Sequence, residues 1–291
     1  MNEYKISNTY TMHTKNIGDL AKIKAVLIKN QNKYYKFLYP EWTHYVRDKE
    51  IELLALRLNK NQKILEIGSG DGYIAYVLKE KYGLNVTASD IEPRYPQYTN
   101  VLKLDGQSTQ LQNSQYDVII SVHVLEHIEN INSALGEFKR LLKNDGYMYH
   151  LVPSTGIMFF TTLVQPLSYF RGIFLYLNGY FYLKYKPFKN KNILRFFKNF
   201  ILFINPYNLF WGTGHGINNR LNCFKNWKTT SWSKIFNKNN LQIVNIEVST
   251  IAYSVHKIFP FKFLSFRKWL ASKGFSSANL FILKKEQNND M

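Results

Sequence analysis

The chain has 291 residues, of which 45% are apolar, and this composition provides a sizeable core and argues against global disorder. It carries a formal net charge of +18 and a single cysteine, Cys223, which excludes an internal disulfide framework and a cysteine-rich metal or iron–sulfur site. The opening stretch "MNEYKISNTYTMHTKN" is polar and lacks the apolar run of a signal peptide, so we expect a cytoplasmic protein.

The excess positive charge lies in the second half of the chain. Residues 1–145 hold 19 Lys and Arg against 17 Asp and Glu, whereas residues 146–291 hold 19 against 3. No acidic residue stands between Asp145 and Glu247, although this segment carries 12 Lys and Arg and many aromatic residues. Such a half of the chain should attract anionic surfaces.

Apolar periodicity predicts a helical N-terminal segment followed by alternating strands and helices. Residues 1–60 form that segment, with a helix that Pro40 can begin. The elements that follow are a strand (63–67), a helix (72–83), three strands (84–90, 100–105 and 116–122), a helix (131–146) and a strand (147–153). Strands and helices that alternate at this spacing predict an α/β fold with a parallel sheet covered on both faces.

The alternation stops after Pro153 and resumes towards the C-terminus. The later pattern predicts a helix over residues 227–240 and strands over 241–249 and 277–286. We therefore expect an N-terminal helical segment (1–60), a core (61–153), an aromatic and basic insertion (154–214) and a C-terminal part of the sheet (215–291).

Three glycines, Gly68, Gly70 and Gly72, follow the first predicted strand in "KILEIGSGDGYIAYVLKE". Parallel sheets bind ligands at the carboxyl ends of their strands, so this loop is the first candidate for a ligand site. A dinucleotide fingerprint would need G-x-G-x-x-G, but Tyr73 stands where its third glycine would fall. The glycines alone do not decide whether the ligand is a dinucleotide or S-adenosylmethionine.

Acidic residues in and after the loop favour S-adenosylmethionine. Asp71 begins the helix and Glu66 precedes the glycines, which disfavours a phosphate and suits a ligand with ammonium and sulfonium charges. Asp90 ends the second strand, where a carboxylate can accept both ribose hydroxyls, and Asp105 ends the third, where an acceptor can meet an adenine amino group. Each acid alone is more typical of a cap or turn, but together with the loop they predict a cofactor site.

Four stretches in order, "ILEIGSGDG", "ASDIEP", "LKLDG" and "YDVIISVHVLEHIENINSALGEFKRLLKNDGYMYHLVP", resemble the successive motifs of class I S-adenosylmethionine-dependent methyltransferases, and of type 11-like domains in particular. The resemblance covers roughly residues 60–153 and, more loosely, 215–250. It implies a Rossmann-like sheet of seven strands with an antiparallel last strand, and S-adenosylmethionine as the cofactor. The cofactor-binding residues that it implies are Glu66, Gly68, Ser69, Gly70, Asp71, Gly72, Asp90, Ile91, Asp105, Gly106 and His123.

Histidines are the candidates for a catalytic base, since their pKa suits proton removal at neutral pH. His123 follows the fourth predicted strand and is expected to border the cofactor, with a role as base as the alternative. His215, in "GTGHGINNR", is the other candidate base, and His127 and His150 are interpreted as structural. The chain has no H-E-x-x-H, no paired cysteines and no clustered carboxylates in its second half, so no metal site is expected.

The expected insertion is apolar, aromatic and basic over residues 157–211. Its charged and polar residues interrupt every run that could span a membrane. The stretch "NKNILRFFKNFILFI" has the character of an amphipathic interfacial helix, and a lid packed onto the core is the equal alternative. A second aromatic and basic stretch, "HKIFPFKFLSFRKWL", follows at residues 256–270.

These features favour a bulky acceptor at the inner face of a membrane, such as a hydroxyl of a surface polysaccharide or a lipid-linked glycan. A quinone or another lipid is the alternative acceptor. RNA is a weaker alternative, because "SVHV" lacks the (D/N)PP(Y/F) that resembles amino-methylating nucleic-acid enzymes. A non-enzymatic alternative is a membrane-associated binding module with a degenerate cofactor fold, and the intact glycine loop, Asp90 and Asp105 argue against it.

Overall fold

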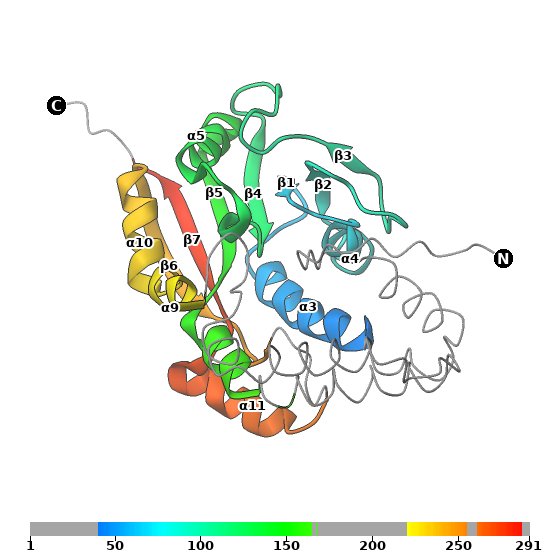
Figure 1. Cartoon of the computed structure of the whole chain (residues 1–291). Helices are drawn as coiled ribbons and strands as arrows, with labels where there is room; N and C mark the ends of the chain where they lie inside the picture. The colour runs from blue at the N-terminus through cyan, green and yellow to red at the C-terminus, as the bar shows by residue number, and fades with distance from the viewer. Residues whose placement is uncertain (1–39, 165–166, 168–219, 255–260, 287–291) are drawn as a thin grey trace, which may run out of the picture.

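The computed structural model describes residues 40–164, 167, 220–254 and 261–286 (Figure 1). The expected N-terminal segment up to residue 39 and most of the expected insertion lie outside these residues. His215 lies outside them as well, so its expected role stays a prediction.

A seven-stranded sheet forms the centre of the molecule, with the order β3-β2-β1-β4-β5-β7-β6 (Figure 1). Strands β1 to β5 pair in parallel, and β7 runs antiparallel to both of its neighbours, β5 and β6. The strands are β1 (Lys63–Ile67), β2 (Asn85–Asp90), β3 (Val101–Lys103), β4 (Tyr116–Val122), β5 (Leu142–Pro153), β6 (Leu241–Val248) and β7 (Ala278–Lys285). The expected Rossmann-like fold with an antiparallel last strand is therefore confirmed.

Local caps mark one end of α4 and one end of α5. Gly83 ends α4 in the left-handed conformation, φ 66°, and its N–H donates to the Lys79 carbonyl. The Asn130 side chain begins α5 by accepting the N–H of Ser133. The named helices are α3 (Pro40–Ala55), α4 (Tyr73–Tyr82), η1 (Leu125–His127), α5 (Ile131–Leu141), α9 (Arg220–Asn226), α10 (Thr229–Lys238), α11 (Leu264–Leu270) and η2 (Ala271–Phe275), and another helix covers residues 155–164.

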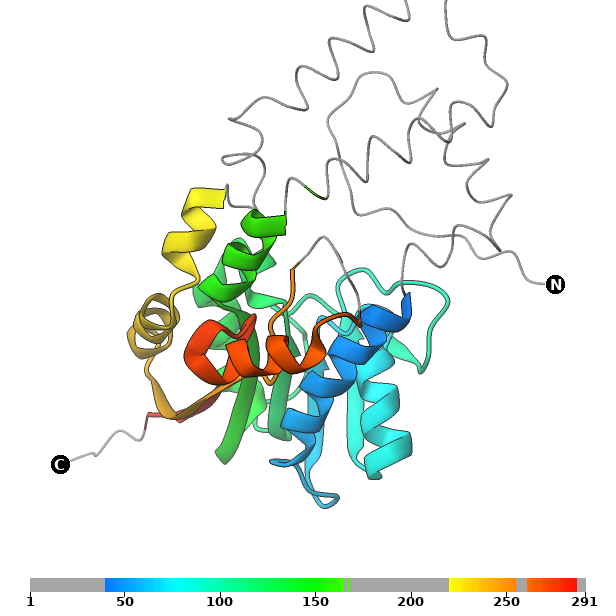
Figure 2. The same ribbon diagram turned by 90° about the horizontal axis from the view of Figure 1, so that it is seen from below.

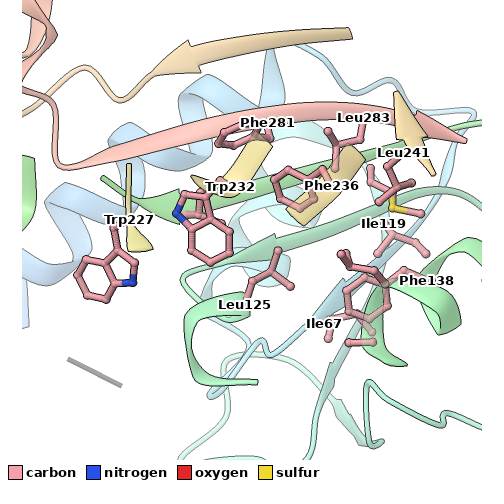
Figure 3. Packing of buried hydrophobic residues seen from close by; sticks show 14 of the residues in the cluster. Ile67, Ile119, Leu125, Phe138, Trp227, Trp232, Phe236, Leu241, Phe281 and Leu283 are labelled. Atoms are coloured by element: carbon pink, nitrogen blue, oxygen red, sulfur yellow. The ribbon is translucent and has the colours of Figure 1, made fainter. Parts of the chain in front are cut away.

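Side chains alternate between the two faces of the sheet along each strand, and helices packed on both faces bury them. On β4, Ile119 belongs to the apolar layer beneath α5 and α10, whereas Val118 and Ile120 belong to the layer beneath α4. Phe236 of α10 and Phe281 of β7 meet in the first layer, with their ring centroids 5.0 Å apart (Figure 3). Because helices cover both faces of the sheet, a ligand site is expected at the ends of the strands.

One predicted helix is too long. The helix expected over residues 131–146 ends at Leu141, and Leu142 is already extended and paired with Tyr116 of β4. The carbonyls of Arg140 and Leu141 accept the N–H groups of residues 114 and 115, so the segment before β4 replaces the hydrogen bonds of a further helical turn. Strand β5 therefore begins at Leu142, five residues earlier than expected.

Candidate active site

The glycine loop joins the end of β1 to the start of α4 in a conformation that favours glycine. Gly68, Gly70 and Gly72 have φ values of 74°, 62° and 79°. A Cβ atom on Gly68 would lie 2.3 Å from Cγ2 of Val124, which follows β4. The loop and the end of β4 are thus in direct contact, and a side chain at position 68 would separate them.

Asp90, at the end of β2, holds the glycine loop through its carboxylate. Its Oδ2 accepts the N–H of Gly70 at 2.7 Å, and its Oδ1 accepts the N–H of Glu92 at 2.9 Å. Each carboxylate oxygen has two lone pairs, so both keep capacity for a further donor such as a ribose hydroxyl. The carbonyl of Asp90 also accepts the N–H of Leu104, which brings Asp105 beside the end of β2.

The other residues expected at the nucleoside lie around this end of the sheet. Ile91 is exposed directly after Asp90. Asp105 is exposed and accepts the N–H of Gln107, and a Cβ on Gly106 would approach Ile67 of β1 to 3.0 Å. The structure therefore gathers the ends of β1, β2 and β3 at one edge, as the expected site requires.

Glu66 is a buried carboxyl group at the end of β1. It is 1% exposed, and its Oε2 has no hydrogen-bond partner among the described residues. Burial, with smaller contributions from Asp71 and Asp90, raises its pKa to about 8, although the Ala75 backbone N–H acts in the opposite direction. A buried carboxyl with an unused oxygen suits a cationic ligand group.

Two further loop residues have different surroundings. The hydroxyl of Ser69 is buried without a hydrogen-bond partner among the described residues, so it is available to a ligand. Oδ1 of Asp71 accepts the N–H of Tyr73 at 3.2 Å, within the first turn of α4. Asp71 therefore stabilises the N-terminus of α4, and it also adds a negative charge to the glycine loop.

A second polar group, which we call the His123 cluster, lies after the end of β4 and comprises Arg47, Glu50, His123, Glu126 and Tyr253. Nε2 of His123 lies 2.9 Å from Oε1 of Glu50 and 3.1 Å from the hydroxyl of Tyr253. The same Oε1 accepts the Tyr253 hydroxyl at 2.9 Å, and Arg47 binds the other oxygen of Glu50. Nδ1 of His123 lies 3.6 Å from Oε1 of Glu126.

The His123 cluster contains buried charges that support one another. Burial opposes the ionisation of Glu50, but Arg47 and His123 lower its pKa to about 2. Burial also opposes protonation of His123, yet the carboxylates of Glu50 and Glu126 raise its pKa. His123 itself has a φ of 54°, an uncommon value for a residue other than glycine that is often found at functional sites.

Sequence reasoning missed four members of the His123 cluster, namely Arg47, Glu50, Glu126 and Tyr253. Glu50 had a signal, because it lies at helical spacing between the buried Val46 and Leu54 of α3. A charge on the apolar face of a helix indicates a buried partner. Tyr253 had no such signal, since only the fold brings the segment after β6 to the end of β4.

His150 and His127 are not members of the His123 cluster. His150 is fully buried in β5, its Nδ1 lies 2.7 Å from the Ser121 hydroxyl, and burial lowers its pKa to about 3. Nε2 of His127 lies 3.9 Å from Oε1 of Glu126. Within the described ranges, no three His, Cys, Asp or Glu side chains are grouped so that they could hold a metal ion.

The sheet order, the antiparallel β7, the glycine loop after β1 and the acidic end of β2 define the class of S-adenosylmethionine-dependent methyltransferases. The chain belongs to the methyltransferase domain family, whose model matches residues 39–246. It is an enzyme of class I, and S-adenosylmethionine is its cofactor.

Two curated relatives are similar to nearly half of the chain. A ubiquinone biosynthesis O-methyltransferase of Rickettsia typhi is 32% identical over 149 residues, or 46% of this chain and 60% of the relative. A protein of the same name from Pelagibacter ubique is 25% identical over 156 residues, or 49% of this chain and 60% of the relative. The similarity thus spans 60% of the length of each relative.

A solved structure has the same fold. In the complex between the Haloferax volcanii Trm112 methyltransferase activator and a methyltransferase, the matching chain has a TM-score of 0.51 at 13% sequence identity. The match covers 90% of this chain and 99% of that chain.

The described residues fit S-adenosylmethionine. The unused oxygen of Glu66 suits an ammonium group, Asp90 has acceptor capacity for ribose, and Gly68 lets the glycine loop pack directly on Val124 after β4. When bound, the cofactor supplies a methyl group on a sulfonium, which carries the driving force of the transfer. The individual contacts expected at Ser69, Ile91 and the other loop residues stay predictions.

We expect cofactor binding to release a proton from Glu66. With a folded pKa of about 8 against a usual 4.5, this carboxyl is protonated near neutral pH in the free protein, and an adjacent ammonium group favours its ionised form. Titration of S-adenosylhomocysteine by calorimetry near pH 7, in buffers of different ionisation enthalpy, should report about one proton released.

Two comparisons test this assignment. Methylthioadenosine, which lacks the amino acid part of the cofactor, should bind without proton release. Glu66→Gln should bind S-adenosylhomocysteine without proton release as well. Equal proton release by the variant and the unmodified protein would contradict the role of Glu66.

Proposed function

We propose that the chain transfers the methyl group to an oxygen atom, and that its acceptor is a phenolic hydroxyl of a lipid-type quinone precursor. The names of the two curated relatives support an oxygen acceptor of this kind. The observation that carries the proposal is the placement of His123, whose Nε2 lies 2.9 Å from Oε1 of Glu50 at the end of β4. The next residue, Val124, packs on Gly68 of the glycine loop, so a proton acceptor stands next to the cofactor site.

In this proposal the protein aligns the acceptor and receives its proton. Methyl transfer is an in-line displacement, for which the protein contributes mainly position and proton transfer. We assign the proton to His123, which Glu50 orients as a carboxylate orients a catalytic imidazole. His215 stays the second candidate base from the sequence.

We also propose that the face formed by α11 touches the inner surface of a membrane. Phe263, Phe266 and Trp269 are each more than half exposed, and Lys262 and Lys268 are exposed beside them. The sequence has no acidic residue between positions 247 and 286, so this face is complementary to anionic lipid. In the part of the chain that the structure describes, no helix is long and apolar enough to cross a membrane.

Vesicle sedimentation tests the membrane contact. The double variant Phe266→Ser, Trp269→Ser should lose sedimentation with phosphatidylglycerol vesicles, whereas Val244→Ser, which changes an exposed apolar residue on β6, should retain it. Unchanged sedimentation of the double variant would show that α11 is not the contact.

A labelled-methyl assay tests the acceptor. S-adenosylmethionine with a tritiated methyl group should label a polyprenyl catechol in detergent micelles. The same assay is run with two other acceptors, namely the surface-polysaccharide or lipid-linked glycan expected from the sequence, and RNA. Label in the glycan or RNA arm alone would replace the proposed acceptor, and label on a nitrogen atom would contradict the proposal.

A further inference from the structure

Three segments that are distant in the sequence meet in the His123 cluster. Arg47 and Glu50 come from α3, His123 and Glu126 follow β4, and Tyr253 follows β6. Figure 2 shows α3 beside α11, and the guanidinium of Arg267 lies 5.1 Å from the Trp42 ring at this contact. The fold thus brings side chains from outside the central motifs to the end of β4.

The hydroxyl of Tyr253 is held in a fixed place. The Tyr253 N–H donates to Oγ of Ser277 at 2.6 Å, and the Ser277 hydroxyl donates to the Tyr253 carbonyl at 2.7 Å. Ser277 is fully buried and directly precedes β7, so the sheet itself anchors this segment. The side chain of Tyr253 is buried too, and its hydroxyl reaches Glu50.

The hydrogen-bond pattern determines which nitrogen of His123 carries the proton. The carboxylate of Glu50 is ionised and has no hydrogen to give, because its pKa is held at about 2. Its Oε1, at 2.9 Å from Nε2 of His123, must therefore accept an N–H. The Tyr253 hydroxyl, at 2.9 Å from the same oxygen, is the second donor, and its own oxygen, at 3.1 Å from Nε2 of His123, can accept the same N–H.

The other ring nitrogen, Nδ1, is not committed in this way. Its distance of 3.6 Å to Oε1 of Glu126 is longer than a hydrogen bond. Both carboxylate oxygens of Glu126 are buried without a hydrogen-bond partner among the described residues. A proton arriving on Nδ1 would therefore give an imidazolium beside the buried carboxylate of Glu126, and the two charges would stabilise each other.

We infer that Glu50 and Tyr253 are positioning residues that keep a proton on Nε2 of His123 and so leave Nδ1 to take the proton of the methyl acceptor. This inference rests on the proposed function. As the acceptor oxygen bonds to the methyl carbon, its O–H bond breaks and the proton passes to Nδ1. The carbon–sulfur bond breaks at the same time, and its electron pair remains on sulfur.

The charges around His123 set the pH range of this step. Glu50 and Glu126 raise the pKa of His123, while burial and Arg47 oppose them. Tyr253 stays a neutral donor, because burial and Glu50 raise its pKa well above 10. Since the raised pKa keeps His123 protonated to higher pH, methyl transfer should increase as the pH rises above about 6.5.

Nuclear magnetic resonance of the protein labelled with ¹⁵N-histidine tests the inference without an acceptor. The spectrum is recorded with S-adenosylhomocysteine bound, and His123 is assigned from the signal that His123→Asn removes. We expect neutral His123 to carry its proton on Nε2. In Glu50→Gln the titration midpoint should fall by about 1 to 3 pH units, the range for loss of an adjacent opposite charge. Tyr253→Phe should lower the share of the Nε2–H form.

Matched variants control for general effects. Glu52→Gln changes another carboxylate of α3, which pairs with Lys49, and Tyr149→Phe changes a tyrosine whose hydroxyl contacts the Arg57 carbonyl. Both should leave the His123 titration unchanged. A neutral ring protonated on Nδ1, or an unchanged midpoint in Glu50→Gln, would overturn the inference.

The pH profile of methyl transfer to the polyprenyl catechol gives the second measurement. Glu50→Gln should lower kcat about 10- to 100-fold, the range for general acid–base help, with little change in KM, and should move the acidic limb to lower pH. If no variant methylates the catechol but the His123 titrations follow the expected pattern, the proposed acceptor fails and the assignment of the proton on His123 stands. An unchanged kcat in Glu50→Gln would overturn its positioning role.

Discussion

Gly68→Ala is expected to weaken cofactor binding strongly. The residue has a φ of 74°, where an alanine side chain is strained, and the added Cβ would lie 2.3 Å from Cγ2 of Val124. Strain and overpacking each cost about 1–3 kcal/mol, and the loop relieves them only by leaving the conformation that faces the cofactor. Calorimetric titration with S-adenosylhomocysteine should show an affinity lower by at least about 30-fold.

Gly136→Ala is the matched control for this change. Gly136 lies within α5, and a Cβ there would have no atom within 4 Å. Alanine in a helix interior is about 1 kcal/mol more favourable than glycine, so this variant should be slightly more stable and should bind the cofactor normally. Normal binding by Gly68→Ala would show that the loop conformation is not needed for the cofactor.

Asp90→Ala is expected to have the second large effect. The substitution removes the acceptor of the Gly70 and Glu92 N–H groups and, in our assignment, the acceptor for ribose. Hydrogen bonds to a charged group contribute about 1.5–3 kcal/mol each, so the loss should weaken S-adenosylhomocysteine binding by about 100-fold or more. Asp90→Asn keeps an acceptor oxygen and should lose less.

Asp117→Ala separates loss of the site from loss of stability. Asp117 also accepts a backbone N–H, that of Lys63 at 2.8 Å, and it pairs with Lys143 near the beginning of β1. This variant should unfold at lower temperature but bind S-adenosylhomocysteine with unchanged affinity. Equal losses of affinity in Asp90→Ala and Asp117→Ala would show that Asp90 acts only on stability.

The fold could be predicted closely because its signals are local. The apolar run Lys63–Ile67 and the stretch Tyr116–Val122 form strands with the expected bounds. The end of α5 could not be predicted, because the turn from Leu141 into β5 depends on hydrogen bonds from residues 114 and 115, which directly precede β4. The pattern of a helix end is visible in the sequence only when the cap is local.

The cofactor side of the site was also visible in the sequence, and the acceptor side was not. Glu66, the glycines and Asp90 lie at the ends of the neighbouring strands β1 and β2, so the order of the sheet brings them together. The contact of Glu50 with Tyr253 joins positions 203 residues apart, and no spacing rule predicts it. The central claim, that the two sides together methylate an oxygen atom, therefore depends on the fold.

Transfer of a deuterated methyl group from S-adenosylmethionine to a polyprenyl catechol, followed by mass spectrometry, tests that claim most directly. The unmodified protein should give a product whose label is bound to a ring oxygen, and Asp90→Ala, at the same cofactor concentration, should give almost none. A protein that binds S-adenosylhomocysteine yet labels no hydroxyl of the catechol or of the glycan and RNA fractions would contradict it.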